Sequence, residues 1–324
     1  MSRARVPVVV AAVVLPLLVL VALVLRPVPT DPRGATIALV ADPVVANAVA
    51  EAIEGGGDGT LEVVVASSLE SARALVEDGT LVAALSVDLE APTDTLVLAG
   101  ANGSRVNEAV VTAVRNALDP FGREVAVQDV HPADVPQHLP GWIVAAGLLA
   151  GAALMLLRRW GGRFVRRSRP PRHVAELIGT DALLYGVVLG SAAFLAGLPG
   201  WPPAWLALGF LLVTIAATVT SVAVRSIGVW GLGVVAALFV LPTWILARAP
   251  HPLLLPTPIE AIGSWMPHGA AAEIAGRLAL FGDGADSRPW LVLLGWAVGG
   301  ILALALSHRL TTPRTPAEPA PIEG

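Results

Sequence analysis

The chain has 324 residues, of which 55% are apolar and only 14% are charged, and this composition excludes an ordinary soluble protein. It has no cysteine, which excludes disulfides, thiolate metal sites and thiol nucleophiles. All 21 basic residues are arginine, and without lysine the chain can form neither a Walker A phosphate loop nor a Schiff base. We therefore expect a membrane protein, and any ATP that drives it must be hydrolysed by another chain.

The first apolar run covers residues 6–25 and follows Arg3 and Arg5. It is either the hydrophobic part of a signal peptide or a first transmembrane helix. We favour the helix, because the run is longer than a usual signal peptide and residues 26–29 offer no cleavage site with small side chains. Residues 1–26 are thus predicted to be a cytoplasmic N-terminus and transmembrane helix 1.

Residues 27–140 differ in character, with 17 acidic residues against five arginines and hence a net charge of −12. Their periodicity predicts the order β-α-β-α-β-β-α-β. The expected strands cover residues 36–40, 61–66, 81–87, 95–99 and 124–130. The expected helices follow the N-caps Asp42, Ser67 and Ser104 and end near Gly55, Glu77 and Leu118. This is an α/β domain large enough to fold by itself.

The negative charge of this domain has two interpretations. It keeps the domain soluble and away from anionic headgroups, or it provides a surface for a cationic partner. We favour the first interpretation and leave the second open.

Five more apolar blocks follow, at residues 141–157, 175–198, 204–224, 227–247 and 290–307. The predicted fold class is therefore a polytopic α-helical membrane protein with six transmembrane helices and an inserted extracytoplasmic α/β domain. Residues 141–308 carry transmembrane helices 2–6, and residues 309–324 form a cytoplasmic tail predicted to be disordered.

The direction of the helices follows from the arginines between residues 158 and 173, because cytoplasmic loops are rich in basic residues. Seven arginines lie there: Arg158, Arg159, Arg163, Arg166, Arg167, Arg169 and Arg172. This loop is predicted to be cytoplasmic, so both termini are cytoplasmic and the α/β domain lies outside. The same arginines are candidates for contact with a cytoplasmic partner or with anionic lipid, the latter at roughly 1 kcal/mol per residue.

A candidate polar site inside the membrane comprises Glu176, Asp181 and Tyr185 in the third predicted helix. A carboxylate there is expensive unless it is paired, faces a wet cavity or is protonated. The functional interpretation is a polar pathway or proton-linked site. The structural interpretation, which we favour, pairs Asp181 with a loop arginine such as Arg172 or with a neighbouring helix.

Three GxxxG pairs, Gly147 with Gly151, Gly186 with Gly190 and Gly295 with Gly299, predict close helix packing. Thr214, Thr218 and Ser221 form a hydroxyl stripe that is more typical of contacts between helices than of a substrate path.

Residues 250–289 are expected to form an outer helical hairpin. Two short helices, at residues 259–266 and 270–281, would join at Pro267-His268-Gly269 and either dip into the outer leaflet or cap the bundle. The candidate outer-gate residues are Glu260, Trp265, His268, Glu273 and Arg277. Neither here nor elsewhere does the sequence contain a metal-ligand, triad, hydrolase or nucleotide motif, so we expect no catalytic residue, cofactor or metal.

Three stretches resemble a known family. They are residues 67–85, which include DGTLVAALSV, then HLPGWIVAAGLLAGA, and PTPIEAIGSWMPHGAAAEIAGRLALFGDG followed by RPWLVLLGWAVGG. With the order of the helices, they resemble the ABC-2 type permeases, and among these the phage-infection-protein-like branch of Gram-positive bacteria. The resemblance implies export across the cytoplasmic membrane by a homodimer or heterodimer of six-helix subunits, with a separate ATPase that contacts the loop at residues 158–173.

Three functions are therefore weighed. The first is a permease subunit, and the second is a membrane-anchored receptor or assembly scaffold whose outer domain binds an envelope or secreted partner. An intramembrane enzyme comes third, because the sequence contains no group of residues with catalytic spacing.

Overall fold

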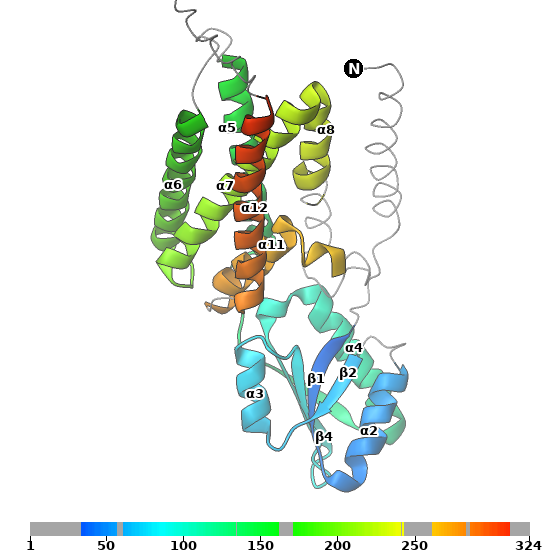
Figure 1. Cartoon of the computed structure of the whole chain (residues 1–324). Coiled ribbons are helices and arrows are strands. Elements are labelled where there is room, and N and C mark those ends of the chain that lie inside the picture. Colours follow the sequence, from blue (N-terminus) through cyan, green and yellow to red (C-terminus); the bar gives the residue numbers. More distant parts are fainter. Residues whose placement is uncertain are drawn as a thin grey trace, which may run out of the picture.

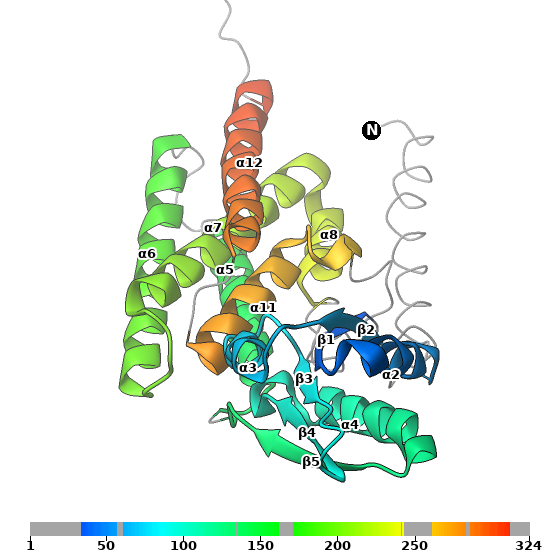
Figure 2. The same ribbon diagram turned by 90° about the horizontal axis from the view of Figure 1, so that it is seen from below.

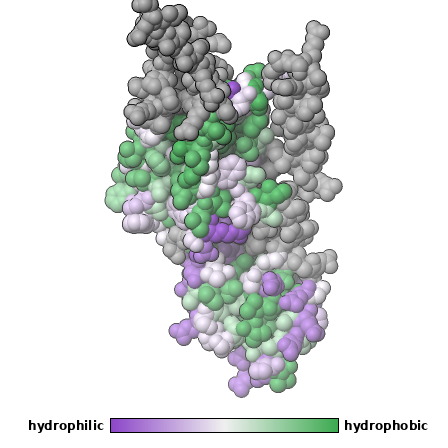
Figure 3. All heavy atoms as spheres, viewed as in Figure 1, coloured by the Kyte–Doolittle hydropathy of each residue, from purple (hydrophilic) through white to green (hydrophobic). Residues whose placement is uncertain are grey.

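The computed structural model describes residues 34–56, 61–133, 135–161, 171–240, 242, 261–282 and 286–311. Figure 1 shows two parts, a helical bundle and an α/β unit that lies at one end of it. The predicted first transmembrane helix, most of the arginine-rich loop and most of the predicted C-terminal tail lie outside the described residues. The first three residues of that tail, 309–311, belong to the helix that ends at Thr311. In Figure 3, apolar residues dominate the visible face of the bundle, whereas polar side chains gather over the α/β unit.

The α/β unit is built on a five-stranded mixed sheet with the order β2-β1-β3-β4-β5. Its strands are β1 (Ala35–Val40), β2 (Leu61–Val65), β3 (Ala83–Ser86), β4 (Thr93–Leu98) and β5 (Glu124–Asp129). Neighbouring strands are parallel except β3 and β4, which form an antiparallel pair. The predicted strands and their order along the chain are confirmed, with small shifts at the ends.

Helices cover the two faces of the sheet unequally. On the first face, α2 (Pro43–Gly56) and α4 (Ser104–Leu118) pack over alternate side chains such as Ile37 and Leu39. On the second face, α3 (Leu69–Glu77) packs over Ala38 and its neighbours. The second face thus has one helix of its own from the α/β unit, against two on the first.

The predicted N-caps are correct at one helix and wrong at two. Asp42 accepts a hydrogen bond from the Val44 amide at 2.9 Å, as expected. At α3 the cap is Ser68, not Ser67. The Ala66 amide still donates a hydrogen bond to the Leu39 carbonyl of β1, so the chain leaves the sheet one residue later than predicted. At α4, Ser104 is already helical and the residue before it is Gly103, whose φ of 103° suits glycine.

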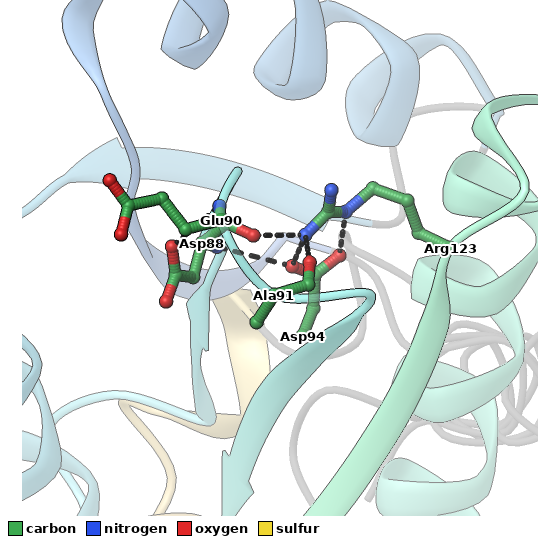
Figure 4. A network of polar contacts seen from close by, with 5 residues as sticks. All are labelled: Asp88, Glu90, Ala91, Asp94 and Arg123. Atoms are coloured by element: carbon green, nitrogen blue, oxygen red, sulfur yellow. Dashed lines mark hydrogen bonds and ion pairs between the residues drawn. The ribbon is translucent and has the colours of Figure 1, made fainter.

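A buried ion pair fastens the turn between β3 and β4 to the start of β5 (Figure 4). Asp94 is fully buried and accepts two hydrogen bonds from Arg123, at 2.7 Å from Nε and 2.6 Å from Nη2. Nη2 also donates to the carbonyls of Asp88 and Ala91. The Asp94 carboxylate is the main cause that raises the pKa of Arg123. Removal of either partner would leave a buried charge or polar group uncompensated, so this cluster stabilises the fold.

Four helices of the described residues are long and apolar enough to cross a membrane. The four apolar segments contain α5 (Leu139–Gly161), α6 (Pro171–Leu195), α7 (Pro202–Ile227) and α12 (Ser287–Thr311). These helices correspond to predicted transmembrane helices 2, 3, 4 and 6. Helix α7 lies at the centre and packs against the other three.

The apolar segment that contains α7 continues to Phe239, but the helix is interrupted at Gly228–Trp230. A Cβ added at Gly231 would lie only 2.5 Å from the carbonyl carbon of Ala223, so the chain folds back on itself. The short α8 (Gly231–Val235) then runs back along α7 (Figure 1). The predicted fifth transmembrane helix starts here, and most of its second half lies outside the described residues.

The predicted break at Pro267-His268-Gly269 is wrong. Helix α11 (Pro267–Gly276) begins at Pro267 and continues into the π-helical turn η6 (Arg277–Phe281). Proline suits the first helical position because its missing amide would have no partner there. The bend lies just before it, where the Trp265 and Met266 amides bond to the carbonyls of Ile262 and Gly263.

Two of the three GxxxG pairs pack inside the chain. A Cβ on Gly151 would meet Ala216 Cβ at 2.8 Å and the Val213 carbonyl oxygen at 2.9 Å, both on α7. A Cβ on Gly186 would meet the Leu206 carbonyl oxygen at 2.7 Å. By contrast, an atom added at Gly295 or Gly299 on α12 would have no neighbour within 4 Å among the described residues.

The hydroxyl stripe of α7 makes no hydrogen bonds between helices within the described part of the chain. Thr214, Thr218 and Ser221 donate to carbonyls one turn earlier in their own helix, at 2.7–2.8 Å. The stripe is nevertheless buried at a contact between helices, as predicted, because a Cβ added at Gly300 of α12 would meet the Thr218 hydroxyl. The hydroxyls take part in this contact by packing, since the backbone of α7 accepts their hydrogen bonds.

Alanine substitutions at Gly151 and Gly295 should separate these two environments. We expect Gly151→Ala to destabilise the bundle by about 1–3 kcal/mol, because the new methyl group has no room against α7. Gly295→Ala is the matched control and should leave stability unchanged or slightly raised. Thermal unfolding in detergent checks both, and equal effects of the two substitutions would contradict the packing described above.

Candidate functional site: the junction of helix α11 with the α/β unit

Helix α11 is wedged into the end of the bundle nearest the α/β unit (Figure 1). It packs against α5, α7 and α12 through a face of small side chains, of which Ala270, Ala271 and Ala275 are fully buried. Leu278 follows on the same side and contacts Gly200, where an added Cβ would lie 3.3 Å from Leu278 Cβ. Packing on the end of the bundle is one of the two predicted arrangements, and insertion into the outer leaflet stays a prediction.

The last residues of η6 leave the bundle and pack on the α/β unit. Leu280 and Phe281 lie against the second face of the sheet, in the cluster that includes Ala38, Val76 and Val97. Phe281 also contacts Gly79, where a Cβ would lie 2.7 Å from the phenyl ring. Gly79 has a φ of 72°, so both the backbone and the phenyl ring favour glycine there.

His131 fixes the same contact from the end of β5. Its Nε2 lies 2.8 Å from the Leu280 carbonyl oxygen, so Nε2 carries the hydrogen and donates it. The imidazole stacks on Phe281 with ring centroids 5.3 Å apart and planes at 28°. The Arg277 guanidinium lies 5.5 Å from the centroid of the same phenyl ring, close enough for cation–π attraction.

The four outer-gate residues that the structure describes are spread from the turn before α11 to the start of η6. Glu260 lies outside the described residues. Trp265 is exposed and lies beside α12, where Arg288 approaches its ring at 5.3 Å and Trp296 Nε1 donates to its carbonyl at 2.8 Å. Arg277 instead belongs to the contact with the α/β unit, at the other end of α11. The helix is central to the site, but its polar residues act in separate places.

His268 and Glu273 are the titratable members of α11. Nδ1 of His268 is enclosed and has no hydrogen-bond partner within the described chain, and burial lowers the pKa of this histidine to about 4. Burial raises the pKa of Glu273, with Arg288 opposing, Asp286 reinforcing and Arg277 opposing. Both side chains therefore favour their neutral forms more than they would in water.

The candidate site inside the membrane is only partly described. Asp181 and Tyr185 are half-buried on α6, and Tyr185 lies close to Gly147 of α5. The side chain of Glu176 lies outside what the structure describes, as do the predicted contacts of the loop arginines from Arg158 to Arg172. Across the described ranges, no group of three or more His, Asp or Glu side chains could hold a metal ion.

The junction residues were not identified from the sequence. Neither Gly79 nor His131 belongs to a candidate site in the sequence. Phe281 was the last residue of a predicted helix. A local pattern contains no signal for their contact, because His131 and Leu280 are 149 positions apart.

Comparison of the chain with protein-family models, with curated proteins and with solved structures gives no match.

The buried state of His268 predicts a pH dependence of stability. The unfolded histidine titrates near pH 6.5 and the folded one near pH 4, so between these values only the unfolded chain binds the extra proton. Stability should therefore be fully present above pH 6.5 and fall by up to about 3 kcal/mol toward pH 4.

The variant His268→Gln isolates this effect from that of Glu273 and other carboxylates. Chemical unfolding of both proteins at several pH values gives the difference in unfolding free energy, which should change with pH only between about 6.5 and 4. A difference that is constant over this range would show that His268 is not held neutral.

Proposed function

We propose that this chain is the permease subunit of an exporter-like, ABC-2 type system in the bacterial cytoplasmic membrane. In this proposal it has six transmembrane helices, cytoplasmic termini and an outer α/β unit. Four of the six helices coincide with the apolar helices described above. The seven arginines of residues 158–173 support the orientation.

The observation that carries the proposal is the shared packing of α11. One face of this helix is buried among α5, α7 and α12, and its continuation through Phe281 is buried against the α/β unit. A movement of α11 should therefore change the position of the α/β unit on the bundle, and a movement of the α/β unit should shift α11. A receptor domain that only captured a ligand would need a flexible connection to the membrane helices, but it would not need to pack against one of them.

In the proposed cycle, α11 is the outer gate. Its buried face consists largely of alanines, and small side chains allow a helix to shift along its neighbours with little interlocking. The α/β unit would bias the position of α11 when it meets substrate on the outer side. A second subunit and a separate ATPase would complete the system, with the ATPase contacting the basic loop.

Single cysteines can test the gate without knowledge of the substrate, because the natural chain has none. Three positions are compared in intact cells with a thiol reagent that does not cross membranes: Glu108→Cys, exposed on α4, Val165→Cys in the basic loop, and Ala275→Cys, buried on α11. Position 108 should react at once and position 165 only after permeabilisation. Position 275 should react roughly 10- to 1,000-fold more slowly than position 108, because a minor open state is populated at roughly 0.1–10%.

Two results would count against the proposal in different ways. Reaction of position 165 from outside would reverse the orientation. Complete protection of position 275, with position 108 reactive, would leave the gate closed and favour the receptor or scaffold.

For the ATPase, a partner that copurifies with the chain should be lost when Arg163, Arg166 and Arg167 are replaced by glutamate.

A further inference from the structure

Strand β5 is the last strand of the sheet and pairs only with β4 within the described residues. The Glu124 amide bonds to the Pro92 carbonyl at 3.4 Å, and the Val130 amide bonds to the Leu98 carbonyl at 2.9 Å. In a parallel pair, alternate residues point both backbone groups to the same neighbour. Even-numbered residues of β5 therefore face β4, and Val125, Val127 and Asp129 point their N–H and C=O groups away from the sheet.

The two edges of the sheet are treated differently. At the β2 edge, the outward amide of Val63 donates to the carboxylate of Glu54 at 3.1 Å, so a side chain of α2 blocks strand addition there. At the β5 edge, the outward groups of Val125 and Val127 have no hydrogen-bond partner in the part of the chain that the structure describes. The strand also contains no proline, a residue that commonly protects an edge.

The β5 edge is also open to solvent. Five of its six residues are exposed, Val125 being half-buried, and Val127 retains 45% of its surface. Figure 2 shows β5 along the border of the α/β unit, on the side away from β1 and β2. An extended segment could therefore approach without displacement of a described element.

Charge decides which extended segment fits. The strand begins with Glu124 and ends with Asp129, in a region whose net charge is −12. Two copies of this region would each bring a net charge of −12, so the pairing of two β5 strands is opposed by repulsion between like charges. A basic strand would instead find opposite charges at the edge and along the approach to it.

We propose that the β5 edge binds an extended basic polypeptide segment of another protein by strand addition. The backbone of residues 125–129 would supply the hydrogen bonds, and Glu124 would pair with a basic side chain on the same face of the extended sheet. This surface does not depend on the transport proposal, because it lies on the α/β unit and involves no residue of the junction.

The first test uses the full chain in lipid nanodiscs and a labelled peptide of the sequence Arg-Val-Thr-Val-Arg-Thr with blocked ends. The peptide should slow hydrogen exchange at the amides of Val125 and Val127 and leave Ala126 and Gln128, which already face β4, unchanged. Two further peptides carry N-methyl groups at odd or at even positions. Strand addition uses one edge of the peptide, so only one of the two should lose binding, by about tenfold or more.

The second test separates a defined edge from general attraction of opposite charges. Glu124→Arg and Glu108→Arg change the net charge equally, but Glu108 is exposed on α4 and is not part of the edge strand. Glu124→Arg should weaken the peptide about three- to tenfold, as expected for loss and reversal of an exposed ion pair, whereas Glu108→Arg should change it less than about twofold.

Each of the following results would overturn the proposal. The peptide fails to bind, both N-methylated peptides bind equally, or both charge variants weaken it equally. Protection of the Val125 and Val127 amides before peptide is added would mean that the edge is already covered. If that protection grows with protein concentration, the occupant is a second copy of this chain.

Discussion

The structure depends on the packing of Leu280 and Phe281 against the second face of the sheet. A sheet that includes parallel strands is usually covered on both faces. Within the α/β unit, α3 is the helix that packs on the second face. The bundle contributes two large apolar side chains that are partly buried in this cluster, so each stabilises the contact by less than the roughly 1.5–3 kcal/mol of a fully buried side chain. The hydrogen bond from His131 to the Leu280 carbonyl then fixes where these side chains enter.

This contact makes the two parts interdependent. The first face of the α/β unit has a core made by α2 and α4 alone. The second face is covered in part by η6 of the bundle, whose Leu280 lies 149 positions after His131 in the sequence. Because α11 and η6 are continuous, the same short segment is buried in both cores. That continuity gives α11 its place in the proposed transport cycle.

The sequence was informative wherever the cause of a structure is local. Alternation placed the five strands, and long apolar blocks placed α5, α6, α7 and α12. The N-cap Asp42 could be predicted because its carboxylate accepts a hydrogen bond from an amide only two residues away. Errors arose where a neighbour distant in sequence decides: the strand pairing of Ala66 moved the cap of α3 by one residue.

The site was predicted less well than the fold for the same reason. Residues of α11 were chosen because they are polar, yet the junction is made mainly by Phe281, Leu280 and Gly79, which look like ordinary core and turn residues in the sequence. The buried pair of Asp94 and Arg123 was also missed, because 29 positions separate its members. The open edge of β5 depends on the order of strands in the sheet, which alternation does not reveal.

The central claim is that Phe281 holds the α/β unit on the bundle, and a distance measurement tests it most directly. Spin labels at Glu108→Cys on α4 and Leu302→Cys on α12, both exposed, report the separation of the two parts by pulsed electron paramagnetic resonance. The distribution should be narrow in the labelled parent and in the control Phe121→Ala, whose ring is exposed, and clearly broadened in Phe281→Ala. An equally narrow distribution in Phe281→Ala would contradict the account.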